Sequence, residues 1–460
     1  MCVKMLAAQR VLVIGLARSG LAAIHSLHKQ GAQIMGYDQK TFDSLGTVGK
    51  ELEQLGVQVV NQWDPDLISD PIDLIVVSPG VPLSLPIFEW AHQQRIPIIG
   101  ELELAYRLKS DQVDLLAVTG TNGKTTTTAL LRYILEKDGR LAYYGGNIGI
   151  ALTSLIENLD EGVVVVEVSS FQLETVENFR PPICGLLNIT PDHLDRHKTM
   201  EAYIEAKSNI FKQQLPHDYA VFNYDDHCLR EIAEKCPATV VFFSAQQQLP
   251  EGFFINNDVI VYQHHQGTTQ ICPVGDIRLR GQHNLENVLC AVAMSYLYGA
   301  KPAMISDALK TFTGVRHRME EVIYNQGVLY VNDSKATNPE SVMKALESFQ
   351  QPIILIAGGR NKGSDFAELA QVLANRVRDL ILLGEARQEI KDAVMKTSFR
   401  NIHEVSDLTE AVNLASQLAV VGDVVLLSPA CASWDQFPSY EHRGDLFCKL
   451  VRSLVEQSPD

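Results

Sequence analysis

A short glycine loop, GTNGKT at residues 120–125, carries the strongest chemical signal in the sequence. We expect a strand, LLAVT, before it and a helix from Thr125 onward, so that backbone N–H groups and the positive end of the helix point at one place. Glycines allow positive φ and close approach, Lys124 supplies a cation for nucleotide phosphates, and the Thr125 hydroxyl suits Mg²⁺. The strict G-x-x-x-x-G-K-[ST] pattern fails, because Val118 stands where its first glycine would be. The shorter loop keeps the same physics and predicts nucleotide binding.

Two further features stand where a nucleotide would need them. Glu167 ends the run VVVVEV, which as a strand would carry the carboxylate to the ligand edge of a parallel sheet. A carboxylate there suits Mg²⁺, directly or through water, although alone it could be an ordinary strand-end acid. Asn284 and Asn287 are three apart and share a helix face. Their amides suit a purine edge, and helix capping explains them equally well.

The segment PDHLDRH follows the expected strand ICGLLNIT and contains two histidines four residues apart. That spacing would suit zinc, but no glutamate follows His193 and no third ligand accompanies His197, so we expect a single histidine beside a phosphate-bound metal. Lys207 lies in the helical pattern EAYIEAKSNIF. The residues alone predict an ordinary solvated helix lysine at that position.

Composition narrows the class of protein. With 460 residues, 46% hydrophobic and 20% charged, the chain is expected to form roughly three globular domains. A formal net charge of −16 argues against nucleic acid or an anionic membrane as a partner, and no run approaches the ~20 apolar residues that span a bilayer. The eight cysteines form no C-x-x-C pair, which predicts reduced thiols and a cytoplasmic protein. We expect a monomer.

Short apolar runs alternate with helical stretches, which predicts an α/β protein with mostly parallel sheets. The strand-like runs are VLVIGL, AQIMGYD, LIVVSPG, LLAVTG, GVVVVEVSS, ICGLLNIT, YAVFNYDD, VLYVNDS, PIILIAGG, DLILLGE and DVVLLSPA. Between residues 240 and 280 the alternation gives way to polar, β-like segments. We expect Rossmann-like domains at residues 1–100 and 315–460 and a P-loop-type ATPase domain at 101–314, with ligands at the carboxyl ends of the strands.

A series of motifs extends over nearly the whole chain, in the order TGTNGKTT, EVSSFQLE, ITPDHLDRH, GQHN with a later asparagine, HRME, NDSKATNP, AGGRNKGSDF and LLSPACASWDQF. Together they resemble the Mur ligase family of peptidoglycan synthesis. The last four are most similar to the members that add D-glutamate to UDP-N-acetylmuramoyl-L-alanine. The DNPR-like stretch of the diaminopimelate- and lysine-adding members is absent from the sequence.

The resemblance implies a three-domain, ATP-dependent amide ligase. A substrate carboxylate would attack the γ-phosphate to give an acyl phosphate, and the amine of D-glutamate would then displace phosphate, while the protein positions groups and neutralises charge. The implied phosphate and magnesium residues are Gly120, Thr121, Asn122, Gly123, Lys124, Thr125, Thr126 and Glu167. His193 would hold a second Mg²⁺. Lys207 matches the lysine that the family carbamylates, which would make it an anionic metal ligand.

The resemblance also implies substrate contacts. Adenine, phosphate and ribose would be held by Asn284, Asn287, Arg318 and Asp333. The two carboxylates of D-glutamate would meet Lys335, Thr337, Lys362 and Ser433, with Trp434 and Tyr440 beside them. The UDP-sugar would lie against Ser19, Asp38, Ser78, Pro79, Gly80, Asn147 and Ser169. Three positions depart from the usual pattern: Ala17 replaces a glycine and stiffens the first loop, and Trp434 and Tyr440 stand where leucine and phenylalanine are common.

Other classes explain less of the sequence. GLARSG with Asp38 about 20 residues on suggests a dinucleotide-binding oxidoreductase, but the middle glycine is missing. A P-loop switch or transport ATPase leaves the flanking domains unexplained. A folylpolyglutamate synthetase adding L-glutamate gives no reason for the VVSPGVP domain in front, and a binding protein without catalysis would not need intact metal and lysine positions. Another acceptor specificity within the Mur ligases stays an alternative.

Overall fold

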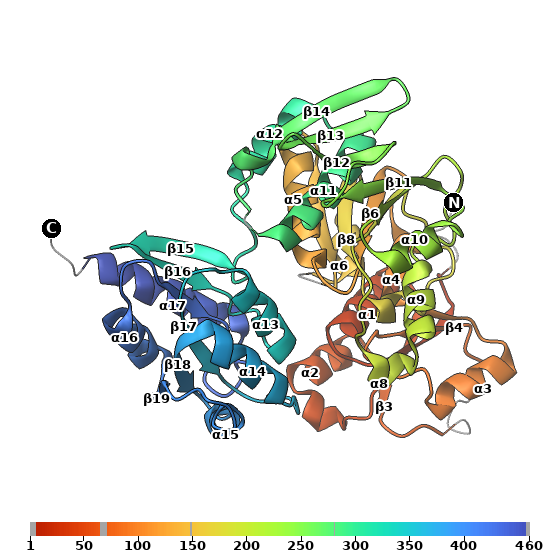
Figure 1. Cartoon of the computed structure of the whole chain (residues 1–460). Coiled ribbons are helices and arrows are strands. Elements are labelled where there is room, and N and C mark those ends of the chain that lie inside the picture. Colours follow the sequence, from red (N-terminus) through yellow and green to blue (C-terminus); the bar gives the residue numbers. More distant parts are fainter. Residues whose placement is uncertain (1–5, 65–70, 148–149, 280, 457–460) are drawn as a thin grey trace. The chain divides into compact units, whose positions relative to one another are not determined.

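The computed structural model describes residues 6–64, 71–147, 150–279 and 281–456. The chain divides into two compact units, Met1–Phe312 and Thr313–Asp460. Among the described residues the strands form three sheets, of which two lie in the first unit and one in the second (Figure 1).

The N-terminal sheet is parallel and has the strand order β3-β2-β1-β4-β5. Its strands are β1 (Arg10–Ile14), β2 (Gln33–Tyr37), β3 (Gln58–Val60), β4 (Leu74–Val77) and β5 (Ile98–Gly100), and its helices are α1 (Arg18–Lys29), η2 (Phe42–Leu45), α2 (Thr47–Gln54), α3 (Pro86–Gln94) and α4 (Glu101–Leu108). Side chains of α1 and α2 cover one face and those of α3 the other. Because both faces are covered, β4 and the part of β1 after Arg10 are continuous runs of buried aliphatic residues.

The central sheet has the order β14-β13-β12-β11-β10-β9-β6-β8-β7. Its strands are β6 (Val113–Thr119), β7 (Ala142–Gly146), β8 (Gly162–Glu167), β9 (Ile183–Leu186), β10 (Tyr219–Asn223), β11 (Thr239–Ser244), β12 (Gly252–Asn256), β13 (Val259–His264) and β14 (Gly267–Pro273). The strands from β7 to β12 pair in parallel, whereas β13 pairs antiparallel with both of its neighbours. The segment at 240–280 therefore extends this sheet, first in parallel through β11 and β12 and then antiparallel through β13 and β14.

The helices of this part of the chain are α5 (Lys124–Lys137), α6 (Leu152–Ile156), α7 (Ser170–Leu173), α8 (Leu194–His197), α9 (Met200–Ser208), α10 (His227–Ala233), η4 (Val274–Asp276), α11 (Gln282–Leu297) and α12 (Pro302–Thr311). Most of them cover the two faces of the central sheet. Side chains of α4, α6, α7, α9 and α10 share one hydrophobic core with the strands. On the other side α5 packs against α11, and both contact the sheet. This arrangement places the start of α5 and the start of α11 at the carboxyl ends of the strands (Figure 1).

The second unit is built on a sheet of order β15-β16-β20-β17-β18-β19, parallel except for β15. Its strands are β15 (Glu320–Asn325), β16 (Val328–Asn332), β17 (Ile353–Gly358), β18 (Val377–Leu383), β19 (Ile402–Glu404) and β20 (Val424–Leu427). Its helices are α13 (Pro339–Glu347), α14 (Ala367–Arg376), α15 (Arg387–Val394), α16 (Leu408–Leu418) and α17 (Tyr440–Glu456). The first three helices pack on one face of the sheet and α16 and α17 on the other.

The predicted α/β class is confirmed, and each apolar run named as a strand contains one. The strands β3, β5, β7, β15 and β19 were not predicted. Each of them lies at an edge of its sheet, where one side is open and a long apolar run is not required.

Candidate active site

The predicted glycine loop connects β6 to α5 and depends on its two glycines. Gly120 has φ +154° and Gly123 has φ +84°. A Cβ at position 120 would lie 2.9 Å from the Leu187 Cβ, and one at position 123 would lie 2.0 Å from the Asn287 Oδ1. Neither site has room for a side chain, and the φ of Gly123 is in the left-handed region that favours glycine.

The loop presents the start of α5 as an anion-binding end. The N-cap, Gly123, provides no side-chain hydrogen bond to the helix. The first backbone hydrogen bond of the helix runs from the Thr127 N–H to Gly123 O, at 3.0 Å. The N–H groups before Thr127 therefore have no acceptor in the helix ladder. Thr125 and Thr126 are buried in this first turn. The Lys124 ammonium donates to Gly120 O at 2.8 Å and to Thr121 O at 2.7 Å, so the cation lies at the loop itself.

The segment after β9 fixes the remaining loop residues. The Asn122 N–H donates to Asn188 Oδ1 at 2.8 Å, and the Thr121 N–H donates to Asn188 O at 2.9 Å. The Thr121 hydroxyl donates to Thr190 O at 3.2 Å and lies 3.1 Å from the Tyr203 hydroxyl. The backbone N–H groups of Thr121 and Asn122 and the Thr121 hydroxyl are thus engaged with the protein. The N–H groups at the start of α5 remain for a ligand.

Glu167 ends β8 next to the loop, in register with Val118 of β6. Its side chain is buried. One carboxylate oxygen, Oε1, accepts from the Asn147 amide at 2.8 Å, whereas Oε2 is buried with no hydrogen-bond partner among the described residues. A buried carboxylate oxygen without a partner is costly unless a cation compensates it. Glu167 therefore has the properties of a metal ligand beside the loop.

Lys207 is only 2% exposed, so the expectation of a solvated helix lysine is wrong. Its Nζ donates to Gly120 O at 2.9 Å, the same carbonyl oxygen that accepts from Lys124, and it lies 4.8 Å from the centre of the Tyr203 ring. Burial lowers the pKa of the Lys207 amine well below its usual value, and the nearby charge of Lys124 lowers it further. The physical reason for the correction is that α9 packs its Tyr203 and Lys207 side into the core beneath the loop.

The two histidines of PDHLDRH have different environments. His193 has φ 53° and a side chain that is 48% exposed, with Nε2 3.5 Å from Asp192 Oδ2. His197 is buried, with Nε2 2.9 Å from the Ser170 hydroxyl and Nδ1 3.3 Å from Glu174, and burial lowers its pKa. Both nitrogens of His197 are thus engaged, and only His193 is open to a ligand.

The described residues contain no group of three or more His, Cys, Asp and Glu side chains arranged to hold a metal ion by themselves. Any ion at the loop would therefore need oxygen atoms of a ligand in addition to Glu167, as expected for an ion that arrives with a nucleotide.

The asparagine pair of α11 reaches the same loop. Asn287 is buried, its amide donates to Asn284 Oδ1 at 3.3 Å, and its oxygen abuts Gly123. Ser169, a candidate for the UDP-sugar, caps α7 in a capping box with Gln172. Glu167, Lys207 and the asparagine pair therefore gather with the glycine loop at residues 120–125.

Most candidates for the UDP-sugar lie just after β1, β2 and β4, whereas Asn147 and Ser169 follow β7 and β8 of the central sheet. Asp38 accepts from the Leu16 N–H at 2.8 Å and from the Lys40 N–H at 3.0 Å, and the Ser78 hydroxyl donates to Gly15 O at 2.7 Å. Ala17 is the exposed N-cap of α1 with φ −78°, a conformation open to any residue, so it brings no backbone strain. The remaining candidates are Ser19 and Pro79, both partly buried, and Gly80, which is exposed.

The second unit holds Arg318 in a turn of unusual conformation. Its neighbours His317 and Met319 have φ 63° and φ 46°, values that non-glycine residues adopt at a cost of roughly 1–3 kcal/mol each. Asp333, just after β16, accepts from the Met319 N–H at 3.2 Å and from the Ser428 hydroxyl at 2.7 Å. Burial raises the pKa of Asp333 to about 6.

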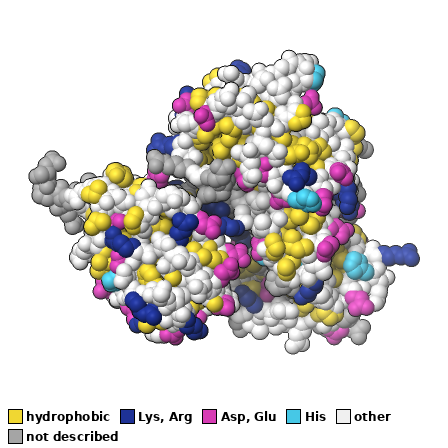
Figure 2. All heavy atoms as spheres, in the orientation of Figure 1, with side chains coloured by type: hydrophobic (Ala, Val, Ile, Leu, Met, Phe, Trp, Pro, Cys, Tyr) yellow, Lys and Arg dark blue, Asp and Glu magenta, His cyan; other side chains and the backbone are white. Residues whose placement is uncertain are grey.

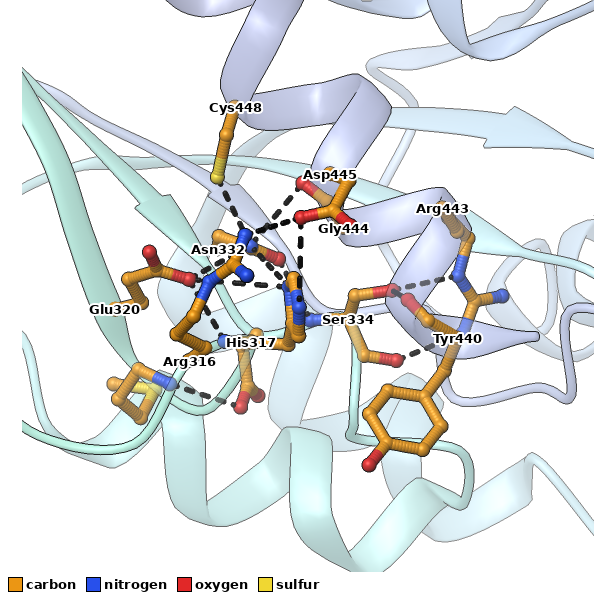
Figure 3. A network of polar contacts seen from close by, with 12 residues as sticks. Arg316, His317, Glu320, Asn332, Ser334, Tyr440, Arg443, Gly444, Asp445 and Cys448 are labelled. Atoms are coloured by element: carbon orange, nitrogen blue, oxygen red, sulfur yellow. Dashed lines mark hydrogen bonds and ion pairs between the residues drawn. The ribbon is translucent and has the colours of Figure 1, made fainter.

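A buried network stabilises this turn (Figure 3). The Asn332 amide lies 3.0 Å from His317 Nδ1 and donates to Glu320 Oε2 at 3.1 Å. His317 O accepts from the Lys335 N–H at 2.9 Å. The buried Arg443 guanidinium donates to Ser334 O at 2.8 Å. Sequence reasoning missed these supporting residues, although the strings HRME and NDS mark the place.

The candidates for D-glutamate lie in the second unit, in the loops that follow β16, β17 and β20 and at the start of α17. The Lys335 ammonium lies 5.9 Å from the Tyr440 ring centre. Ser433 is buried, whereas Trp434 is 60% exposed. The other two candidates are Thr337, partly buried, and Lys362, which is exposed. Two cations and two hydroxyls are thus carried by the loops after the parallel strands of one sheet.

The described surface shows no segregation of charge on the face drawn in Figure 2, where acidic and basic side chains are interspersed. Among the described helices, none has the length and apolar character that a bilayer span requires.

Family models match most of the chain. The model of the MurD-like N-terminal domain of Mur ligases matches residues 9–100, that of the Mur ligase middle domain matches 118–295, and that of the Mur ligase glutamate ligase domain matches 317–431.

Full-length relatives carry the name UDP-N-acetylmuramoylalanine--D-glutamate ligase. The relative from Alkaliphilus metalliredigens (strain QYMF) is 43% identical over 449 residues, which are 97% of this chain and 98% of the relative. That from Clostridioides difficile (strain 630) is 44% identical over 449 residues, 97% and 99% of the two chains. That from Koribacter versatilis (strain Ellin345) is 44% identical over 450 residues, 98% of each.

Solved structures share the fold at low identity. The MurF ligase from Thermotoga maritima in complex with ADP has a TM-score of 0.59 and 17% identity, with 99% of each chain covered. The UDP-N-acetylmuramate-alanine ligase MurC from Thermotoga maritima has a TM-score of 0.56 and 19% identity, with 97% of this chain and 99% of that one covered. At these identities the likeness concerns the fold.

Proposed function

The chain belongs to the Mur ligase family, and from that premise we propose how its residues carry out the reaction. The reaction is the ATP-dependent addition of D-glutamate to UDP-N-acetylmuramoyl-L-alanine in peptidoglycan synthesis, as in the full-length relatives. The carboxylate of the UDP-sugar substrate is activated as an acyl phosphate, and the amine of D-glutamate then displaces phosphate to form the amide.

The unpartnered Glu167 Oε2 is the observation that carries the proposed chemistry. It lies buried beside a loop at a helix N-terminus, which attracts phosphate. The Gly120 carbonyl in this loop accepts hydrogen bonds from two lysine side chains, those of Lys124 and Lys207. These residues fit a nucleotide with Mg²⁺, which would neutralise the charge of the phosphates when bound. Thr125 and Glu167 would hold the ion at the nucleotide, and His193, whose ring is open to ligand, would hold a second.

Lys207 would take part as a carbamate. Its burial and its lowered pKa favour the neutral amine, which is the form that attacks CO₂. A new N–C bond forms, one proton leaves, and the side chain becomes an anion. That change replaces an uncharged amine, a poor ligand for Mg²⁺, by an anion with oxygen ligands, and it places the negative charge beside Lys124.

The substrates would divide among the domains. We assign the UDP-sugar to residues 1–100, where polar groups gather at the ends of β1, β2 and β4. ATP belongs to residues 101–314, and D-glutamate to 315–460, where Lys335 and Lys362 supply the cations. The chain would work as a monomer in the cytoplasm, a compartment consistent with the free cysteines among the described residues; Cys2 lies outside those residues.

An assay of ADP release tests the assignment. Turnover should require both UDP-N-acetylmuramoyl-L-alanine and D-glutamate, because the acyl phosphate forms on one substrate and is consumed by the other. L-Glutamate serves as the matched control, since it differs only in the configuration at Cα. Equal turnover with L-glutamate, or with no amino acid, would overturn the proposed function.

A further inference from the structure

Arg196, in the motif PDHLDRH, has no role in the proposed chemistry, yet its guanidinium is fixed by hydrogen bonds and by an aromatic ring. It belongs to α8, the single turn that follows His193. Its side chain is 17% exposed and makes three contacts, two with α7 and its C-cap and one with the turn after β4. The contacts therefore join two different segments of the first unit.

Two of the contacts fix α8 on α7. The Arg196 Nη2 donates to Glu174 Oε2 at 2.6 Å, and the other oxygen of Glu174 lies 3.3 Å from His197 Nδ1. The guanidinium also lies 4.4 Å from the centre of the Phe171 ring, and the same ring contacts the imidazoles of His193 and His197 at 4.8 and 5.5 Å. The turn that carries His193 is therefore held between a carboxylate and an aromatic ring.

The third contact reaches the N-terminal sheet. Arg196 Nη1 donates to the backbone carbonyl of Pro79 at 3.0 Å, across 117 residues of sequence. Pro79 lies in the turn between β4 and α3, next to Ser78, whose hydroxyl holds Gly15 O. One planar side chain thus links the turn at 78–80 to the turn at 193–197.

We propose that Arg196 is a positioning residue that sets the distance between the UDP-sugar turn at 78–80 and the turn that carries His193. This inference rests on the proposed function, in which the first turn holds the UDP-sugar and His193 holds the second Mg²⁺. A long, flexible substrate gains little from either turn alone, because the reacting carboxylate must also be brought to its place beside the loop. A guanidinium can join the two turns rigidly, since its donors form a planar fork and engage Pro79 and Glu174 at once.

The test compares Arg196→Ala and Arg196→Lys with a matched control, Arg180→Ala. Arg180 belongs to the same unit, is 32% exposed and pairs with Asp218 at 2.7 Å. For Arg196→Ala we expect the KM for the UDP-sugar to rise about tenfold, the effect of losing one charge-assisted hydrogen bond, with the KM for ATP changed less than about twofold. Arg196→Lys should fall between wild type and alanine, because an ammonium cannot meet both partners in one plane.

Hydrogen exchange provides a readout that does not depend on activity. The Val81 N–H bonds to Ser78 O, and the His197 N–H bonds to His193 O, both at 3.0 Å. Both segments should exchange faster in Arg196→Ala than in wild type, and at the wild-type rate in Arg180→Ala. Should the alanine variant fail to fold, Arg196→Lys and Glu174→Gln give the same comparison.

The inference is overturned if the KM for ATP rises as much as that for the UDP-sugar, or if exchange at both turns is unchanged. Failure of the proposed function is distinguishable from this result. A wild-type protein that does not turn over the UDP-sugar refutes the function, while the exchange rates at the two turns still decide the role of Arg196.

Discussion

Replacing Glu167 by glutamine tests the proposed metal site, because the change should have opposite effects on stability without and with ligand. Glutamine keeps an oxygen for the Asn147 amide, which now lies 2.8 Å from Oε1, and it removes the charge from the unpartnered Oε2. An unpaired buried polar group costs about 1–3 kcal/mol, and more when it is charged. Without ligand, the variant should therefore be as stable as wild type or more stable by about 1 kcal/mol, which corresponds to roughly 2 °C in melting temperature.

With nucleotide and metal the order should reverse. A ligand at 100 times its Kd stabilises the native state by about 2.7 kcal/mol, and the part that depends on Mg²⁺ should be lost in Glu167→Gln. The measurement is a set of melting curves with a non-hydrolysable ATP analogue, in the presence of Mg²⁺ or of a chelator.

Glu157→Gln is the control for this experiment. Glu157 also has a buried oxygen with no partner among the described residues, Oε1, while its Oε2 binds Lys29 at 2.9 Å, but it belongs to the end of α6 rather than to β8. This variant should keep the full Mg²⁺ effect. The reasoning is refuted if Glu167→Gln retains that effect as well, or if it melts several degrees below wild type without ligand.

Three further variants test other parts of the site. Lys207→Ala should lower turnover by at least about 100-fold and be partly rescued by a small added carboxylate, since the missing group is an anion; near-normal steady-state turnover would contradict this. Gly123→Ala places an alanine in the left-handed conformation, at a cost of about 1 kcal/mol, and pushes a Cβ onto Asn287. Calorimetry should therefore show at least about tenfold weaker nucleotide binding. An unchanged Kd would contradict the assignment of the nucleotide to the loop. The Asp333 pKa is raised to about 6 from 3.8, so the native state binds the proton more tightly than the unfolded chain, and stability falls by up to about 3 kcal/mol as the pH rises from about 4 to about 6. Asp333→Asn should remove that slope, and melting curves of the two proteins that run parallel between pH 4 and 7 would disprove it.

The loop and Glu167 could be predicted because their signals are local. A run of buried aliphatics that ends in glycines fixes a strand, a turn and a helix N-terminus within a few residues. Glu167, at the end of the neighbouring parallel strand β8, then lies at the same edge of the sheet. The burial of Lys207 was not predicted from the residues, although a signal existed: Lys207 lies four residues after Tyr203 and three before Ile210, on one helical stripe with two residues that are fully buried.

The supporting contacts could not be predicted, because they join residues that no local pattern connects. Arg196 donates to a backbone carbonyl 117 residues away. Because every residue has such a carbonyl, the sequence does not show which one is the acceptor. The network around Asn332 depends on His317 in a left-handed conformation. A histidine in the sequence does not predict that conformation. The edge strands were missed for a related reason, since pairing on one side asks for less apolar character than burial on both.

The charge around Gly120 O suggests an order of events at the loop. Two amines share this carbonyl, and burial with mutual repulsion disfavours the charged form of Lys207. A neutral Lys207 carries no charge that would attract or repel a metal ion, whereas its carbamate would add an anion near Glu167. The unpartnered oxygen of Glu167 already favours a cation at this place. Capture of CO₂ should then strengthen metal binding, and the bound metal should in turn retain the carbamate, because the two equilibria are linked. The Mg²⁺ requirement of turnover should accordingly fall as bicarbonate is raised, and a requirement independent of bicarbonate would separate Lys207 from the metal.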